Sequence, residues 1–233
     1  MEYVLGLKAM NNDLEVLYED NHIIVVVKPC NVLSQSDSTH DIDMLTIVKQ
    51  YIKKKYNKPG NVYIGLVHRL DRPVGGIMVF ARSSKAASRL SETIKKHEFS
   101  KSYLAIVNGI IDKKEGRLTD YLLKLENGNT VVTTKEKGKL SILDYKVLEE
   151  NKSHNLSLVE ISLITGRHHQ IRVQFSSRNH PLFGDQRYGS GNNANISLWA
   201  YKLEFVHPVR KEKMKFIYYP QDNNGWNLFK FKK

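Results

Sequence analysis

Short apolar runs separated by polar stretches recur along the whole chain, which is typical of a sheet-rich protein with few helices. β-branched residues are frequent in these runs, and turn residues bound them. The runs predict strands at residues 14–18, 23–28, 63–67, 77–81, 101–107, 140–147, 156–164, 198–206 and 214–219. We therefore expect many antiparallel neighbours in the sheet.

Two further segments have the spacing of amphipathic helices. In residues 44–56 the apolar side chains share one face with lysines opposite, and Pro59-Gly60 ends the segment. Ser83 or Ser84 is expected to cap a second helix. The apolar face of this second helix is formed by Ala87, Leu90 and Ile94.

A third helix is predicted over residues 167–177. Ile171 and Phe175 lie four residues apart, so we expect both to face the core. By the same spacing, His168 and Arg172 are expected to share another face of this helix.

The organisation of the chain indicates one domain. Its 233 residues are 41% hydrophobic, which is enough for a substantial core, and there is no internal repeat or long linker. We expect one domain over residues 1–233 with a core of about residues 14–220. Polar connections are predicted at residues 34–43, 112–115, 135–139 and 149–155.

The charge balance points to a polyanionic partner. The 36 lysine and arginine residues outnumber the 24 acidic residues, which gives a formal net charge of +12. Such an excess attracts phosphates over long range and is the electrostatic footprint of nucleic-acid binders. Each short lysine run taken alone is typical of a solvated face. These runs occupy residues 53–55, 95–96, 113–114 and 230–233.

Cysteine usage and hydropathy indicate the compartment. Cys30 is the only cysteine, so neither an intramolecular disulfide nor a thiolate metal cluster can form. The longest purely aliphatic run, residues 23–27, is far shorter than a membrane span, and the N-terminus lacks the pattern of a secretory leader. We expect a soluble cytoplasmic protein.

Asp71 is the main candidate for chemistry. It stands between two arginines in a turn bounded by proline and glycine and flanked by two apolar strands. Arg69 and Arg72 favour the ionised carboxylate, and an ionised aspartate on a rigid frame can act as nucleophile or base. Together with His68 these residues could instead form a surface ion-pair cluster, and this segment alone does not decide between the two.

Five motifs follow one another along nearly the whole chain. They are a strand ending in Lys28-Pro29, His-Arg-Leu-Asp at residues 68–71, Lys-Ser-Tyr-Leu-Ala at residues 101–105, residues 165–173 followed by 180–185, and a closing strand at residues 198–203 followed by 205–208. In this order and spacing they resemble the RluA-type family of RNA pseudouridine synthases.

The resemblance implies isomerisation of selected uridines in structured RNA. The N-glycosidic bond is cleaved, the uracil rotates, and it is reattached through carbon. Ribosomal RNA is slightly favoured over transfer RNA, and no metal or organic cofactor is implied. The implied fold is α+β: a mixed, mainly antiparallel sheet split around a central cleft, with flanking helices and Asp71 at the cleft floor.

The motif matches also imply roles for individual residues. Asp71 matches the essential aspartate, which attacks or deprotonates the target nucleoside. Tyr103 matches the tyrosine that packs against the target base, and Arg172 the arginine that pairs with the aspartate from a separate segment. Arg69 matches the arginine that helps to extrude the base. The residues expected to bind RNA or the base are His68, Arg69, Arg72, Arg167, His168 and Gln170.

Some positions depart from the family pattern. Gly75 stands where serine is usual, Gln174 replaces a common histidine, and His168 stands where serine or threonine is usual. None of these removes a group that the chemistry needs, so we expect the RNA preference to be affected rather than the activity. Only 27 residues precede Lys28, too few for the N-terminal RNA-binding domain of many relatives. We expect a monomer that binds structured RNA through its catalytic domain, with no membrane and no obligatory protein partner.

The main alternative is a catalytically idle RNA-binding or RNA-chaperone module that uses the same cleft. Retention of Asp71, Tyr103 and Arg172 argues against it, because binding alone prefers less negative charge near phosphate. A glycosidase would need a second carboxylate, and a metal nuclease would need clustered acids or histidines. His168-His169 is the only histidine pair, and because adjacent helical residues point apart, we do not expect metal binding.

Overall fold

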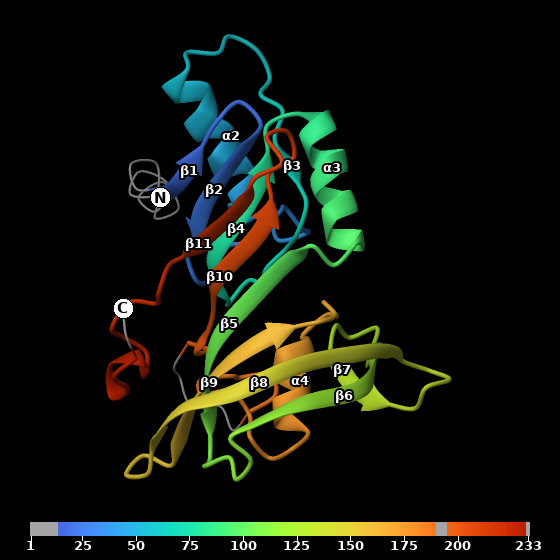
Figure 1. The fold of residues 1–233 in the computed structure, drawn as a ribbon, viewed down its shortest axis with the longest axis vertical. Helices are drawn as coiled ribbons and strands as arrows, with labels where there is room; N and C mark the ends of the chain where they lie inside the picture. Colours follow the sequence, from blue (N-terminus) through green and yellow to red (C-terminus); the bar gives the residue numbers. More distant parts are fainter. Residues whose placement is uncertain (1–13, 190–194, 232–233) are drawn as a thin grey trace. The chain divides into compact units, whose positions relative to one another are not determined.

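The computed structural model describes residues 14–189 and 195–231, which form two compact units (Figure 1). Unit 1 contains the described residues up to Phe99 together with Leu203–Tyr218. Unit 2 contains the described part of Ser100–Lys202 and the residues from Tyr219 onward. Residues 1–13 and 232–233 of the expected single domain lie outside the described residues, and the single domain stays a prediction.

Unit 1 is built on a sheet whose central strands are buried along their whole length. β2 (Ile23–Lys28) lies between β1 (Val16–Glu19) and β4 (Gly75–Ala81) and is antiparallel to both. Every residue of β2 and β4 is buried, so both faces of these strands are covered. β3 (Gly65–Leu66) pairs with β4. β10 (Leu198–Val206), which belongs to unit 1 from Leu203 onward, follows β4 in the strand order and pairs with β11 (Lys213–Ile217).

The two helices of unit 1 begin at side-chain caps. In α2 (Met44–Lys55) the Asp43 carboxylate accepts a hydrogen bond from the backbone N–H of Thr46 at 3.1 Å. In α3 (Ser84–Lys95) the Ser83 hydroxyl accepts one from the backbone N–H of Ala86 at 3.2 Å. Each cap satisfies an N–H that has no partner within the first helical turn. Both helices are confirmed, and of the two candidate serines Ser83 is the cap.

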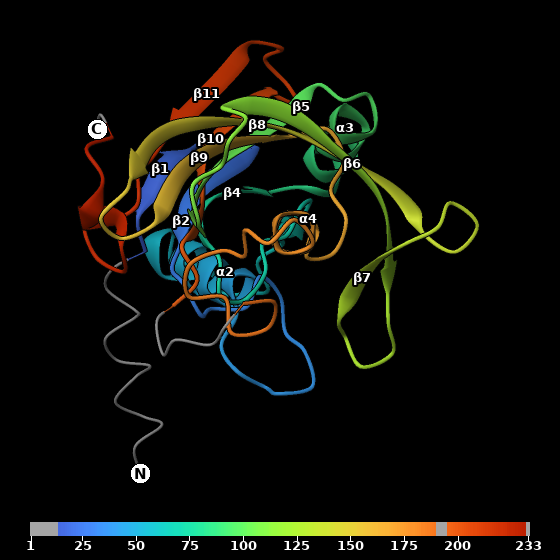
Figure 2. The same cartoon turned by 90° about the horizontal axis from the view of Figure 1, so that it is seen from below.

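Unit 2 is an antiparallel sheet that curves around a short helix. Its strand order is β5 (Phe99–Asn108), β9 (Leu156–Leu163), β8 (Lys139–Asn151), β6 (Glu115–Lys124) and β7 (Thr130–Thr133). The curved strands lie on one side of α4 (Gln170–Ser176), as Figure 2 shows. The Phe175 ring of α4 meets the Tyr145 ring of β8 with centroids 5.7 Å apart. The short 3-10 helix η1 (Trp226–Leu228) follows near the C-terminal end of the described chain.

Several element bounds differ from the sequence prediction. β6 and β7 have no predicted counterpart. The buried leucines of β6, Leu118 and Leu122, share one face of the strand with the polar Asp120 between them. Asp120 therefore interrupts the alternation that identifies a half-buried strand. β3 has two residues where five were predicted, and β8 continues to Asn151, into a segment predicted as a polar connection.

The start of α4 is a clear correction. The helix begins at Gln170, three residues later than predicted, because His169 has a φ of 51° and this left-handed conformation does not continue a right-handed helix. His168 is exposed and precedes the helix, whereas Arg172 is buried within it, so the predicted shared face is wrong. The burial of Ile171 and Phe175 is confirmed.

The α+β class with a mixed, mainly antiparallel sheet is confirmed. The central cleft, and the position of Asp71 at its floor, stay predictions. Within residues 14–189 and 195–231, no helix combines the length and the hydrophobicity needed to cross a membrane.

Candidate active site

Asp71 lies in the loop between β3 and β4, and the backbone before it is held by a serine. The Ser34 hydroxyl donates to the carbonyl oxygen of Leu70 at 2.7 Å and accepts from the N–H of the same residue at 3.1 Å. Both Ser34 and Leu70 are buried. The carbonyl oxygen of Asp71 itself accepts from the N–H of Val74 at 3.0 Å, which closes the turn.

The backbone after Asp71 is held by Lys28, the last residue of β2. Its ammonium donates to the carbonyl oxygens of Pro29 at 2.9 Å, Arg72 at 3.0 Å and Val74 at 2.7 Å. Lys28 is fully buried, and burial lowers its pKa to about 7, although the charges of Cys30 and Asp71 act in the opposite direction. The sequence analysis placed Lys28 in a motif without giving it a role.

His68 is part of the same framework. Its Nε2 atom accepts from the backbone N–H of Val79 at 3.1 Å, and its ring packs against Phe99 with centroids 5.2 Å apart. The side chain is buried, so its observed contacts fix the loop against β4. The predicted contact of His68 with RNA stays a prediction.

The two arginines beside Asp71 differ in their surroundings. Arg69 is exposed. Arg72 forms a half-exposed ion pair with Asp41, with 2.7 Å between Nη2 and Oδ2. Gly76, the second residue of β4, has a φ of 127°, a conformation that L side chains rarely adopt. The backbone at this end of the strand therefore depends on glycine.

In unit 2, Tyr103 lies on β5 opposite Ile161 of β9 and is buried. Lys101, two residues earlier, shares its side of the strand because side chains alternate along a strand. Burial lowers the pKa of Lys101. The motif that predicted Tyr103 therefore places an aromatic ring and a lysine side by side on one face.

Arg172 of α4 is fixed by a carboxylate that the sequence analysis did not identify as a partner. Its Nε and Nη2 atoms donate to the two carboxylate oxygens of Asp185 at 2.8 and 2.7 Å. Asp185 also accepts from the backbone N–H groups of Arg187 at 2.9 Å and Tyr188 at 3.2 Å. The guanidinium lies over the Tyr188 ring, 5.1 Å from its centroid.

Electrostatics in this cluster follow from burial and charge. Burial alone would raise the pKa of Asp185, but the hydrogen bonds and charge of Arg172 outweigh burial and lower it. The pKa of His169 is lowered to about 3, first by burial and then by the positive charge of Arg172. His169 is therefore neutral at physiological pH, and its Nδ1 atom lies 2.7 Å from the Tyr188 hydroxyl.

The other predicted residues of this segment have mainly structural contacts. The Gln170 side chain accepts from the Thr165 hydroxyl and from the N–H of Arg167, both at 2.9 Å, and donates to the carbonyl oxygen of Ile142 at 3.0 Å. The Arg167 Nε atom donates to the carbonyl oxygen of Leu140 at 3.0 Å. These bonds shape the turn before α4, and the RNA contacts of Gln170 and Arg167 stay predictions.

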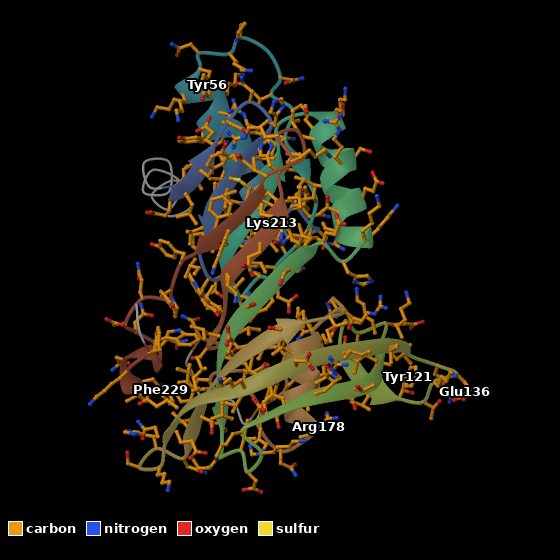
Figure 3. All side chains as sticks on the ribbon, viewed as in Figure 1. Tyr56, Tyr121, Glu136, Arg178, Lys213 and Phe229 are labelled. Atoms are coloured by element: carbon orange, nitrogen blue, oxygen red, sulfur yellow. The ribbon has the colours of Figure 1, made fainter. Side chains whose placement is uncertain are left out.

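Gln174, which departs from the family pattern, is buried in α4. Its amide nitrogen donates to the Asp120 carboxylate at 2.7 Å. Arg178, labelled in Figure 3, donates to the same carboxylate at 2.9 Å. The amide thus joins α4 to β6, which gives this residue a packing role.

The histidine pair differs from its prediction. The rings of His168 and His169 lie against one another with centroids 3.7 Å apart, because neither residue is within the helix. The expectation that they point apart is wrong. His168 Nδ1 lies 2.9 Å from the Thr130 hydroxyl of β7. Among the described residues, no group of three or more His, Cys, Asp or Glu side chains could hold a metal ion.

Each unit thus brings part of the predicted site together. His68, Arg69, Asp71 and Arg72 lie in unit 1, and Tyr103, Arg167, His168, Gln170 and Arg172 lie in unit 2. The predicted pairing of Arg172 with Asp71 joins residues of different units and stays a prediction. The site also contains four residues to which the sequence analysis gave no role: Lys28, Ser34, Asp185 and Tyr188. Lys28 and Asp185 stand within family motifs, whereas Ser34 and Tyr188 lie outside them.

Comparison with known proteins identifies the enzyme family of this chain. A family model described as RNA pseudouridylate synthase matches residues 22–177. An uncharacterized RNA pseudouridine synthase of Aquifex aeolicus (strain VF5) is 30% identical over 224 residues, which cover 91% of this chain and 71% of that protein. The chain belongs to the RNA pseudouridylate synthase family and is an isomerase, so the resemblance to the RluA-type enzymes is confirmed.

Several relatives are named ribosomal large subunit pseudouridine synthases. The ribosomal large subunit pseudouridine synthase C of Escherichia coli O157:H7 is 32% identical over 221 residues, covering 89% of this chain and 66% of that protein. Among solved structures, human RNA pseudouridylate synthase domain containing 4 has a TM-score of 0.76 at 20% identity and covers 94% of this chain and 93% of its own. Human RNA pseudouridylate synthase domain containing 1 has a TM-score of 0.72 at 23% identity, and the match covers 91% of this chain and 85% of that one. These two structures establish the fold, and this chain spans about two thirds of the length of the curated relatives.

Proposed function

We propose that this protein converts specific uridines of a folded RNA into pseudouridine, with Asp71 as the group that starts the reaction. The observation that carries the proposal is the fixed backbone on both sides of Asp71, held by Ser34 before it and by Lys28 after it. A carboxylate mounted in this way loses little conformational freedom when the nucleoside binds.

The reaction keeps every atom of the nucleoside. The bond between uracil N1 and ribose C1′ breaks, the uracil rotates, and a bond forms between C5 and C1′. The proton on C5 leaves, and N1 gains a proton. Asp71 acts as nucleophile or as base at the start of this sequence, the two roles that an ionised carboxylate supports. The balance requires no oxidant, reductant or second substrate.

Arg172 is the proposed positioning residue for Asp71. A guanidinium has five donors, and Asp185 takes one on Nε and one on Nη2. The edge that carries Nη1 has the fork geometry that suits a second carboxylate. Because Asp185 and Tyr188 hold the guanidinium, Arg172 keeps a fixed orientation.

Tyr103 is the proposed partner of the target base. Its ring offers a flat apolar surface for uracil, and its hydroxyl can reach a proton. The burial of Tyr103 on β5 supports a rigid stacking surface, although an ordinary core tyrosine would be buried as well. Substitution separates the two roles, as described in the Discussion.

RNA contacts are proposed for the exposed arginines. A uridine within a folded RNA must leave its stack before the carboxylate can reach it, and the Arg69 cation can take the vacated place. Arg72 can exchange Asp41 for a phosphate at little cost, since a half-exposed ion pair contributes only about 0 to 1 kcal/mol. The proposed contacts of His68, Arg167, His168 and Gln170 complete this set.

The proposed substrate is a ribosomal RNA stem-loop. The net charge of +12 supports a polyanionic substrate, and the named relatives include ribosomal large subunit enzymes. The single cysteine fits the reducing cytoplasm, and the protein is proposed to act there as a monomer. The proposed reaction steps require no cofactor.

A comparison of strains tests the substrate. Pseudouridines in ribosomal and transfer RNA are mapped in a parent strain, in a deletion strain, and in deletion strains that express the wild-type protein or the Asp71→Asn variant. The proposal expects one or more ribosomal sites to disappear on deletion and to return only with the wild type. Return of the sites with the variant would support an idle RNA-binding role instead, and loss of no site in either RNA would contradict the proposal.

A further inference from the structure

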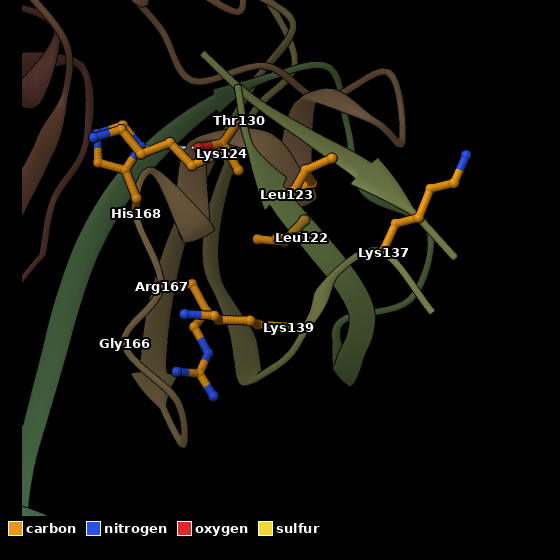
Figure 4. A pocket seen from close by; sticks show the side chains of 9 residues that line it. All are labelled: Leu122, Leu123, Lys124, Thr130, Lys137, Lys139, Gly166, Arg167 and His168. Carbon is orange, nitrogen blue, oxygen red and sulfur yellow. Dashed lines mark hydrogen bonds between the residues drawn. The ribbon is translucent and has the colours of Figure 1, made fainter. Parts of the chain in front are cut away.

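Unit 2 contains a pocket of about 460 Å³ beside the hairpin formed by β6 and β7 (Figure 4). Its walls come from the end of β6, the start of β7, the turn into β8 and the segment just before α4. Of its lining residues, only Gly166, Arg167 and His168 belong to a motif of the family. The pocket is therefore a feature of this chain that the motifs did not predict.

The charged side chains that line the pocket are all basic. They are Lys124, Lys137, Lys139 and Arg167. Some exposed cations elsewhere in unit 2 are paired, as in the ion pairs of Lys114 with Glu150 and of Arg117 with Asp144. Within the described part of the chain, no carboxylate forms an ion pair with the four pocket cations. Glu136, labelled in Figure 3, lies in the turn between β7 and β8.

A concave surface with charges of one sign concentrates the potential and attracts a counter-ion of the opposite sign. Four cations around one hollow are therefore best explained by an anionic ligand. A solvated face would instead spread such charges over a convex surface.

The remaining walls suit a nucleotide better than a bare anion. Arg167 is held by its Nε bond to the carbonyl oxygen of Leu140, so its guanidinium is pre-oriented. The exposed His168 ring is held by Thr130 at 2.9 Å and by the adjacent His169 ring. Leu122 adds apolar surface, and Figure 4 shows the leucines of β6 between Lys137 on one side and Arg167 and Lys139 on the other. RNA-binding proteins combine phosphate-binding cations with rings and apolar surface against unstacked bases.

We propose that this pocket binds an unpaired nucleotide of the substrate RNA, with the phosphate on Arg167 and the lysines and the base against Leu122 and the His168 ring. The inference rests on the proposed function for its ligand and extends it to a recognition site outside the family motifs. The volume lies within the range of about 300 to 1,000 Å³ that is typical of small-ligand sites.

Two double variants with the same change of charge test the proposal. Lys124→Ala/Lys139→Ala removes two pocket cations, and Lys113→Ala/Lys152→Ala removes two exposed lysines of unit 2 outside the pocket. Both lower the net charge by two, so long-range attraction changes equally. The dissociation constant for a ribosomal RNA stem-loop transcript is measured by fluorescence anisotropy over a series of KCl concentrations, after thermal unfolding has confirmed that each variant is folded.

Loss of two phosphate contacts should lower the slope of log K against log [KCl] by about 1.5, since each contact contributes roughly 0.7 to 0.9. The pocket variant should show this loss, the control should keep the wild-type slope, and Lys124→Arg/Lys139→Arg should keep it too. Equal slopes in both alanine variants would overturn the proposal. Weaker binding of UMP with an unchanged RNA slope would also overturn it, because the pocket would then serve a free nucleotide.

The two proposals fail separately. Absence of pseudouridine formation by the wild-type protein on any RNA would defeat the proposed function, whatever the slopes. Pseudouridine formation by the wild type together with equal slopes in the two alanine variants would defeat only the pocket.

Discussion

Arg172 and Asp185 form a buried, bidentate ion pair, with 2.8 Å between Nε and Oδ2 and 2.7 Å between Nη2 and Oδ1. The Asp185 side chain is completely buried, and two backbone N–H groups bind its Oδ1 atom as well. The positioning residue of the proposed site is thus itself positioned by a second carboxylate. Asp185 fixes Arg172, and Arg172 is proposed in turn to orient Asp71.

Removal of Asp185 should destabilise the fold strongly. Asp185→Ala leaves the Arg172 guanidinium buried without this counter-charge, and breaking a buried pair costs about 3 to 5 kcal/mol. Asp144→Ala, which breaks the exposed pair with Arg117, is the matched control and should cost no more than about 1 kcal/mol. Urea denaturation measures both free energies of unfolding, and equal losses would contradict the structural role of Asp185.

Lys28 predicts a pH dependence of stability. Its native pKa of about 7 lies below the ordinary value of 10.5, so between these pH values the unfolded chain binds more protons than the native chain. The contribution of this group to stability therefore rises with pH across that window, and the cost of burying the charge is complete below pH 7.

Lys28→Met should flatten that rise by about 3 to 5 kcal/mol over the window, at roughly 1.4 kcal/mol per pH unit. The exposed Lys152→Met is the matched control and should give a curve parallel to the wild type. Urea unfolding of the three proteins at pH values between 6 and 10 supplies the comparison. A Lys28→Met curve parallel to the wild type would show that the buried ammonium does not titrate in this range.

Substitution of Arg172 should separate charge from geometry. Arg172→Ala should abolish most turnover, and Arg172→Lys should restore only a part, because lysine keeps the charge but lacks the planar fork that holds two carboxylates. The loss should lie in kcat, with RNA affinity changed much less, since the proposed role is to orient Asp71. Arg117→Lys serves as the control at an exposed pair. Full activity of Arg172→Lys would show that the planar fork of the guanidinium is not required.

Tyr103 should respond differently to loss of its hydroxyl and loss of its ring. Tyr103→Phe keeps the stacking surface, whereas Tyr103→Ala loses both functions. Base stacking on an aromatic ring contributes roughly 1 to 3 kcal/mol, so Tyr103→Ala should weaken productive binding by about one to two decades. Single-turnover kinetics over a range of enzyme concentrations measures this loss. If both variants behave like the wild type, Tyr103 is an ordinary core residue.

The sequence correctly predicted elements whose determinants lie within a few neighbouring residues. The continuous apolar run of β2 gave the bounds of the strand, because a strand buried on both faces needs no alternation. The serine before α3 marked the start of the helix, because a hydroxyl satisfies a first-turn N–H within three residues. Both signals act over a few residues and are visible in the sequence.

Contacts between residues far apart in the chain were not predicted from the sequence. The pairing of Arg172 with Asp185 joins residues thirteen positions apart, and no spacing rule links a helical arginine to a loop carboxylate. The left-handed conformation of His169 delays α4 and brings two histidine rings together, and the helical spacing of the apolar residues that follow contains no signal for it. The basic pocket depends on β6 and β7, and the sequence did not predict β6 because the polar Asp120 interrupts its apolar face.

The most direct test of the account is tritium release from an RNA transcript labelled at C5 of uridine, because the C5 proton leaves only when pseudouridine forms. The transcript contains the ribosomal stem-loop identified by the strain comparison. The purified wild type should release tritium in proportion to the pseudouridine formed. Asp71→Asn is isosteric and should bind the same RNA and unfold at the same temperature without detectable release, while the control Asp112→Asn should match the wild type. Substantial release by Asp71→Asn would contradict the central role of this carboxylate.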